Sequence, residues 1–157
     1  QAMRRQDREV LQPEQIDAII ESCDCLRLGL NAEDGAYIVP LNFAYVPGKP
    51  AKFYFHSAKE GRQVDMIGQG AKAGFELDGA HRLGEAETGC RHTFFYQSVI
   101  GTGTVRPVET LEEKKRALSA IMAHYRKDCA FSFTDEQADA VAVFCLTAET
   151  MSCKQHS

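Results

Sequence analysis

Short turns between strand-like segments dominate this sequence and determine its fold class. Residues 26–31 form an apolar, alternating segment that turns at Asp34-Gly35 into a second strand pattern over residues 36–46. Asp-Gly between two strand patterns is a strong hairpin signal, and residues 47–50 (PGKP) make the next turn. Strands joined by such short connections run antiparallel. The sequence therefore predicts an α+β protein, mainly antiparallel, with a barrel-like sheet and flanking helices.

The other elements follow from periodicity and caps. Helical spacing predicts helices over residues 13–23 and 110–126, the second begun by a capping box of Thr110 and Glu113. Pro40 lacks an N–H for the ladder, which indicates an edge strand, a bulge or a strand end. Further strands are expected over 52–57, 72–77, 93–109 and 141–151, a short capped turn at Thr134, and a polar loop over 78–92.

Composition limits the function classes. The 157 residues suit a single domain, 1–157, and carry a net charge of −4 with acids and bases well mixed. This balance argues against a nucleic-acid or acidic-membrane partner, which would favour a basic face. No apolar run approaches the ~20 residues of a membrane span, and the first residues lack a secretory apolar core. The six cysteines lack CxxC spacing, so we expect reduced thiols, no metal site and a cytoplasmic location.

Residues 52–70 (KFYFHSAKEGRQVDMIGQG) have a more specific pattern, in which a strand is followed by a cationic turn and then by a short helix. The question is whether this turn binds an anion. Lys59 and Arg62 flank Gly61, and arginine is suited to two-pronged contact with phosphate. Helix N-termini also favour anions. Glu60 would repel a phosphate unless it points to solvent, so these residues alone leave two readings open. The turn either binds an anion or is a solvated connection.

Five segments in the same order resemble the pyridoxamine 5′-phosphate oxidase-like flavin-binding split barrels, and most closely the nitroimidazole-resistance (Nim) branch. They are MRRQDREV, VPLNFAY, FYFHSAKEGRQVDMI, FYQSVIGTGTV and EEKKRALSAIMAHY, spread from about residue 3 to 150. The resemblance implies a six-stranded split barrel that forms a homodimer, with flavin mononucleotide (FMN) in the groove between the subunits.

The resemblance also implies a set of cofactor-binding residues. The phosphate would meet the residues after the strand that ends at Ser57, and the flavin ring would run along the strand containing Pro40. A further strand would contribute from a neighbouring segment or subunit. Many relatives have Lys where this chain has Gln63, a difference that could favour FAD over FMN. The implied set is Pro40, Leu41, Asn42, Phe43, His56, Ser57, Ala58, Gly61, Arg62, Gln63, Tyr96, Gln97 and Ser98.

His56 is the catalytic candidate, since the histidine of this segment lies near the flavin in Nim relatives and titrates near neutral pH. The alternative is a core histidine bonded to backbone. The implied activity is a flavin-dependent, nitroreductase-like oxidoreductase that transfers two electrons from a reductant to a small oxidised or nitro-bearing substrate. Two rivals are a non-catalytic flavin-binding module and a haem-binding split barrel. A pyridoxamine-phosphate oxidase is disfavoured, because no second basic cluster suited to a substrate phosphate is visible.

Overall fold

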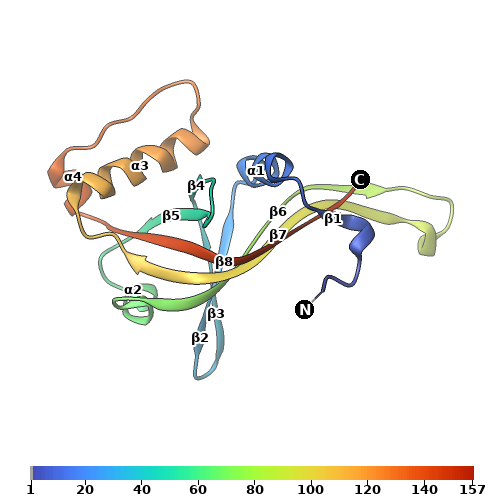
Figure 1. The fold of residues 1–157 in the computed structure, drawn as a ribbon, viewed down its shortest axis with the longest axis horizontal. Helices are drawn as coiled ribbons and strands as arrows, with labels where there is room; N and C mark the ends of the chain where they lie inside the picture. Colours follow the sequence, from blue (N-terminus) through green and yellow to red (C-terminus); the bar gives the residue numbers. More distant parts are fainter. Residues whose placement is uncertain (1) are drawn as a thin grey trace.

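A computed structural model describes residues 2–157, which form an α+β fold built on an eight-stranded sheet (Figure 1). In chain order the elements are η1 (Gln6–Arg8), β1 (Glu9–Val10), α1 (Pro13–Ser22), β2 (Leu26–Ala32), β3 (Gly35–Leu41), β4 (Ala44–Val46), β5 (Lys52–Ser57), α2 (Arg62–Ile67), β6 (Ala71–Gly84), η2 (Gly89–Arg91), β7 (Thr93–Pro107), α3 (Leu111–Tyr125), α4 (Asp135–Asp139) and β8 (Ala142–His156). No helix of the described residues has the length and apolar character to cross a membrane.

The sheet curls back on itself. Its strand order is β3-β2-β6-β7-β8-β5-β4, all of the pairs are antiparallel, and β1 pairs with β8. The two ends of this path, β3 and β4, are not hydrogen-bonded to each other, yet only Asn42 and Phe43 separate them in the chain. The six strands of six or more residues give the predicted split-barrel class, and β1 and β4 are short additions.

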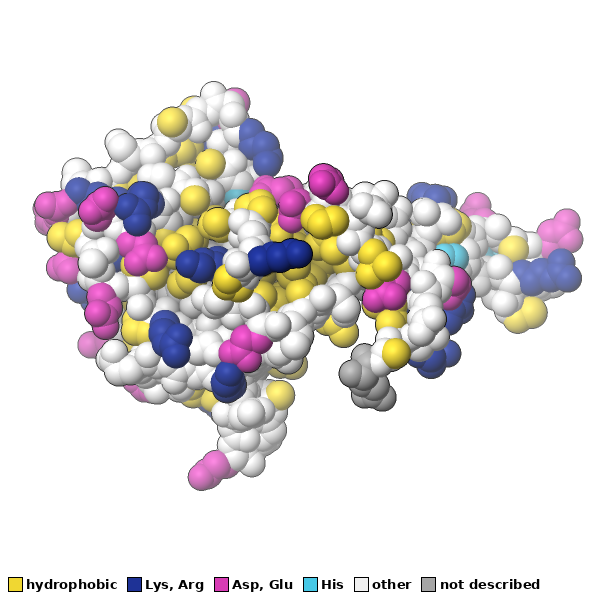
Figure 2. Space-filling view, in the orientation of Figure 1, with side chains coloured by type: hydrophobic (Ala, Val, Ile, Leu, Met, Phe, Trp, Pro, Cys, Tyr) yellow, Lys and Arg dark blue, Asp and Glu magenta, His cyan; other side chains and the backbone are white. Residues whose placement is uncertain are grey.

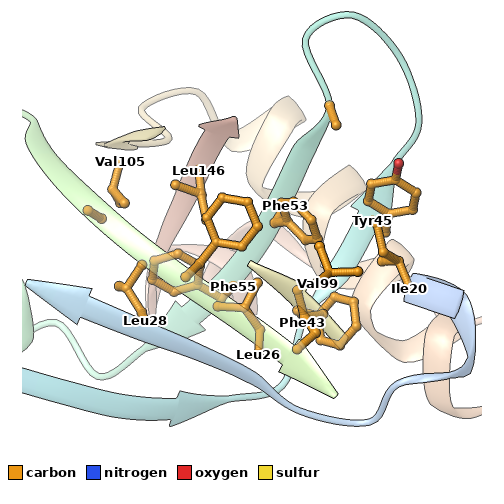
Figure 3. Packing of buried hydrophobic residues seen from close by; sticks show 14 of the residues in the cluster. Ile20, Leu26, Leu28, Phe43, Tyr45, Phe53, Phe55, Val99, Val105 and Leu146 are labelled. Atoms are coloured by element: carbon orange, nitrogen blue, oxygen red, sulfur yellow. The ribbon is translucent and has the colours of Figure 1, made fainter. Parts of the chain in front are cut away.

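The core fills the inside of this curled sheet. Leu26 and Leu28 from β2, Phe53 and Phe55 from β5 and Val99 from β7 are wholly buried and point toward one another (Figure 3). Ile20 of α1 closes one side of the cluster. Each fully buried side chain of this size contributes roughly 1.5–3 kcal/mol relative to exposure. The alternation predicted for these strands is therefore confirmed.

Local signals at the helices also hold, with one exception. Thr134 and Gln137 form a complete capping box on α4. Thr110 accepts the backbone N–H of Glu113 at the start of α3, but the reciprocal bond is absent. The carboxylate of Glu113 instead accepts the hydroxyl of Tyr54 at 3.0 Å, so a tertiary contact replaces half of the predicted box.

Residues 78–84 correct the sequence prediction, since they continue β6 instead of forming a loop. The polar, glycine-bearing sequence conceals a strand because a register shift between Gly79 and Arg82 interrupts its alternation, with Ala80 at φ 52°. Beyond this bulge β6 and β7 form an arm that leaves the barrel (Figure 1). The strand predicted over 36–46 is likewise divided at Asn42, and β8 extends five residues past its predicted end.

Gly101 and Gly103 accommodate a neighbouring backbone. A Cβ at Gly101 would overlap the carbonyl oxygen of Thr150, and one at Gly103 would overlap that of Thr147. The β7–β8 register also shifts between Thr102 and Gly103. A glycine inside a strand indicates a bulge or a close approach by a ligand or another backbone. Here both glycines lie at a bulge where the backbone of β8 comes close.

Candidate functional site

Strand β5 divides its side chains between the core and the opposite face. Phe53 and Phe55 point inward, and Tyr54 and His56 lie on the opposite face of β5, against which α3 packs. Burial, followed by its hydrogen bond to Glu113, raises the pKa of Tyr54 to about 12. Tyr54 is thus a neutral packing residue that ties β5 to α3.

His56 is not a core histidine. Its side chain reaches the surface, where no hydrogen bond to another described residue holds it. Nearby protein atoms still displace enough water to lower the pKa of its imidazole below the ordinary 6.5. A neutral, unengaged imidazole at a strand end can accept or relay a proton.

The turn after β5 is set by Gly61, which precedes α2. Its φ of 141° and ψ of 172° lie in a region that only glycine occupies readily. The helix that follows is only six residues long, so its dipole offers little to an anion, and side chains must carry any binding. Gln63 is buried, and its Nε2 has no hydrogen-bond partner among the described residues. An unsatisfied buried amide costs roughly 1–3 kcal/mol.

Both cations of this turn have acidic partners. Lys59 Nζ lies 3.7 Å from Asp139, and Arg62 donates to Asp34 at 3.0 Å. The Arg62 guanidinium also lies 4.7 Å from the ring centroid of Tyr37. These pairs are exposed, and such pairs contribute only about 0–1 kcal/mol. A stronger anion could therefore displace the carboxylates.

An open hollow of about 660 Å³ adjoins Arg62. Asn31 at the end of β2 and Glu33 and Asp34 of the β2–β3 turn line its other side. Nothing in the sequence connects this hairpin turn with Arg62, because they are distant in the chain. Their carboxylates now compete with any phosphate at this position.

The implied ring-binding segment spans the end of β3 and the link to β4. Pro40 lies on an edge strand, as predicted, opposite Arg27. Asn42 is exposed, but Phe43 is wholly buried, and its ring centroid lies 4.4 Å from that of His124, with the two rings tilted. The Phe43 N–H already donates to the Tyr125 hydroxyl at 3.2 Å. Phe43 therefore contributes to the core, and Asn42 is the more accessible of the two.

Tyr96, Gln97 and Ser98 lie far from the turn that follows Ser57. Ser57 is opposite Ala142 on β8, whereas Ser98 is opposite Lys154. At roughly 3.3 Å per residue these positions are about 40 Å apart along the strand. Figure 1 shows β8 crossing the molecule from the α4 end to the C-terminus. Within one subunit, the turn after Ser57 and the segment of residues 96–98 are thus too far apart along β8 for one flavin mononucleotide to contact both.

The cysteines provide no metal centre. All six are free thiols, and no cluster of three His, Cys, Asp or Glu residues in the described chain has metal-ligand geometry. Burial raises the pKa of Cys23 to about 11, which disfavours the thiolate that a metal requires.

The sequence did not predict a cluster of titratable side chains on β2 and β6. Arg27 donates to Glu76 at 3.0 Å and lies 3.4 Å from Asp78, whose other oxygen is 3.1 Å from His81. Burial, followed by Asp78, raises the pKa of Glu76 to about 7, and the hydrogen bond from Glu76 lowers the pKa of Asp78. Only the strand register brings these residues together.

Comparison with known proteins agrees with this architecture. The family model described as pyridoxamine 5′-phosphate oxidase matches residues 12–155. The chain belongs to this family. The resemblance noted in the sequence is thereby confirmed, while the family's activity does not follow from membership alone. A search of curated proteins found no significant match.

Solved structures give the same fold. A protein from Bacteroides thetaiotaomicron, provisionally assigned to 5-nitroimidazole antibiotic resistance, is 29% identical with a TM-score of 0.79, over 94% of this chain and 86% of its own. An FAD- and haem-binding protein from Mycobacterium smegmatis has a TM-score of 0.82 at 16% identity, over 96% and 74%. An FAD-binding protein from Mesorhizobium loti has a TM-score of 0.63 at 17% identity, over 94% and 96%.

Proposed function

We propose that this protein is a homodimeric flavoprotein that binds FMN or FAD between subunits and reduces a small oxidised or nitro-bearing molecule. The observation that carries the proposal is the division of the implied site between the two ends of β8. A two-fold dimer would let Arg62 of one subunit and Ser98 of the other meet the same ligand. The Bacteroides protein, with its nitroimidazole assignment, and the FAD-binding structures support this class of ligand and substrate.

The residues present fit a flavin phosphate. Gly61 leaves open space at the turn, and the Nε2 of Gln63 is a donor without a partner among the described residues. Lys59 is held by an exposed ion pair, and Arg62 by an exposed ion pair and the ring of Tyr37. When bound, the flavin supplies two-electron transfer between a diffusible reductant and the substrate. His56, neutral at pH 7 because its pKa is lowered, would relay a proton to the reduced product.

The outer surface supports association of two copies. Ile38 and Ile100 are 64% and 55% exposed on the face of the sheet turned from the core, and Phe94 on the arm is 52% exposed. Figure 2 shows hydrophobic side chains gathered over the middle of the molecule, with acidic and basic groups around them. Large apolar side chains exposed together favour a protein interface.

The test is the visible spectrum of the purified protein, followed by acid release and mass identification of the chromophore. Flavin bands near about 370 and 450 nm, with FMN or FAD released, would support the proposal. An intense band near about 400 nm would indicate haem, the ligand that the Mycobacterium protein also binds. A colourless protein that takes up no added flavin would refute the cofactor. With flavin bound, unchanged nitro-compound turnover in His56→Ala would refute the proton-relay role.

A further inference from the structure

A second cationic site lies at the other end of the molecule from the Arg62 turn. A cavity of about 480 Å³ lies between the N-terminal segment, residues 2–9, and strands β7 and β8. Figure 1 shows this segment beside the two strands near the C-terminus. The cavity is lined by Met3, Arg4, Ser98, Ile100, Ser152 and Lys154, with Glu9 at one side.

Strand register explains why these side chains converge. Ser98 is opposite Lys154, and Ile100 is opposite Ser152. Directly opposed residues of antiparallel strands point to the same face. The buried Val99 points into the core, so Ser98 and Ile100 point outward. Two hydroxyls, one ammonium group and one apolar side chain therefore share a small patch beneath the N-terminal segment.

The cations that line this cavity outnumber its carboxylates among the described residues. Of the three N-terminal arginines, only Arg5 forms an ion pair, a two-pronged contact with Asp7 at 2.8 and 2.7 Å. Arg4 and Lys154 form no ion pair within residues 2–157. Arg8 lies 3.4 Å from the Tyr96 hydroxyl, and its buried Nε lacks a partner.

Glu9 is the objection, because it lines the cavity and is opposite Lys154 in the ladder. Arg4 and Lys154 outnumber it, and Arg8 is close by. The chain as a whole carries a net charge of −4, so this excess of positive charge is a local feature and not part of a general field.

We infer that this cavity binds the oxyanion of a small organic ligand, a phosphate or carboxylate. Arg4 and Lys154 neutralise the charge, and the hydroxyls of Ser98 and Ser152 donate to its oxygens. The body of the ligand packs against Ile100 and Met3. The volume suits a small molecule. The sequence predicted no second basic cluster, because Arg4 and Lys154 stand at opposite ends of the chain.

The oxyanion has two possible sources. Ser98 belongs to the set implied by the family resemblance, so the group can be a phosphate of a flavin dinucleotide held by a second subunit. It can equally be the charged group of a free ligand. The cavity exists in one subunit, so the inference does not depend on the proposed flavin chemistry.

The test is calorimetric titration of flavin-free protein with phenyl phosphate, with phenol as the uncharged control. We expect binding of phenyl phosphate that the variant with Arg4→Gln and Lys154→Gln weakens at least tenfold. Arg5→Gln is the matched control, since it removes the same charge one residue away but from a guanidinium already paired with Asp7. It should change affinity less than twofold.

Three results would overturn the inference: no binding at millimolar phenyl phosphate, equal weakening by Arg4→Gln and Arg5→Gln, or unchanged binding in the variant with Arg4→Gln and Lys154→Gln. If the double variant unfolds, Arg4→Gln alone decides, because Arg4 is exposed and outside every helix and strand. Loading with FMN or FAD then identifies the source. A dinucleotide phosphate in the cavity would block phenyl phosphate in the FAD form only, and a free-ligand site would bind it in both.

Discussion

The two ends of β8 present cations in opposite ways. At the Ser57 end, Lys59 and Arg62 are close in sequence, and each is held by a carboxylate from elsewhere. At the C-terminal end, Arg4 and Lys154 come from distant parts of the chain and form no ion pair among the described residues, although Glu9 lines the same cavity. A contiguous motif therefore marks a place where charge can be gathered, but tertiary structure decides whether that charge is free.

The sharpest way to break this comparison is Arg62→Ala. If the paired end holds the flavin phosphate, loss of a charge-assisted contact of about 1.5–3 kcal/mol should weaken FMN binding about ten- to hundredfold. Fluorescence titration of flavin-free protein measures the change. Arg116→Ala, which removes an arginine from an equally exposed ion pair on α3, is the matched control and should leave affinity unchanged. Equal retention by both variants would remove Arg62 from the site.

Gly61→Ala tests whether the paired end depends on its backbone. An alanine at φ 141° should lower the free energy of unfolding by about 1–2 kcal/mol. Gly89→Ala is the control, because it too has open space around its Cβ but lacks a positive φ. Urea denaturation compares the two, and equal stabilities would show that the turn relaxes without cost.

Asp34→Asn removes the acidic partner of Arg62, so the Ser57 end of β8 should then resemble the C-terminal end, where the cations form no ion pair among the described residues. Without the carboxylate that competes for Arg62, FMN should bind about two- to fivefold more tightly, in line with an exposed pair. The same titration measures it. Weaker binding would mean that Asp34 positions Arg62 and does not compete with the ligand.

The least direct effect on the two ends concerns Glu76, which lies on the sheet between them. Its folded pKa of about 7 exceeds the ordinary 4.5, so the folded state binds more protons than the unfolded state between these values. This residue therefore makes stability fall as pH rises from about 4.5 to 7. Glu76→Gln should flatten that part of the curve, measured as thermal unfolding against pH. An unchanged slope would contradict the raised pKa.

The sequence was most informative where signals are local. The pattern of Phe53 and Phe55, the box at Thr134 and the hairpin near Gly35 depend on neighbours in the chain, and each was predicted. Residues 78–84 were missed because a bulge hides their alternation. Likewise, Arg62–Asp34 and Arg4–Lys154 are brought together by the tertiary fold, since the members of each pair are far apart in the chain.

In the candidate site, too, the residues of local motifs could be predicted and those brought together by the tertiary fold could not. Family resemblance supplied a set of residues, and the fold placed them at two ends of one strand. His56 and Arg62 could be named from a contiguous motif. Their carboxylate neighbours Glu33 and Asp34, and the cavity beneath the N-terminal segment, could not.

The most direct test of a flavin shared between subunits is sedimentation velocity of the purified protein, followed at about 450 nm where flavins absorb. We expect the absorbance to sediment as a single species of twice the chain mass, with one flavin per subunit. Flavin absorbance that sediments with a monomer would contradict the shared site, and so would a dimer that carries no flavin after incubation with FMN or FAD.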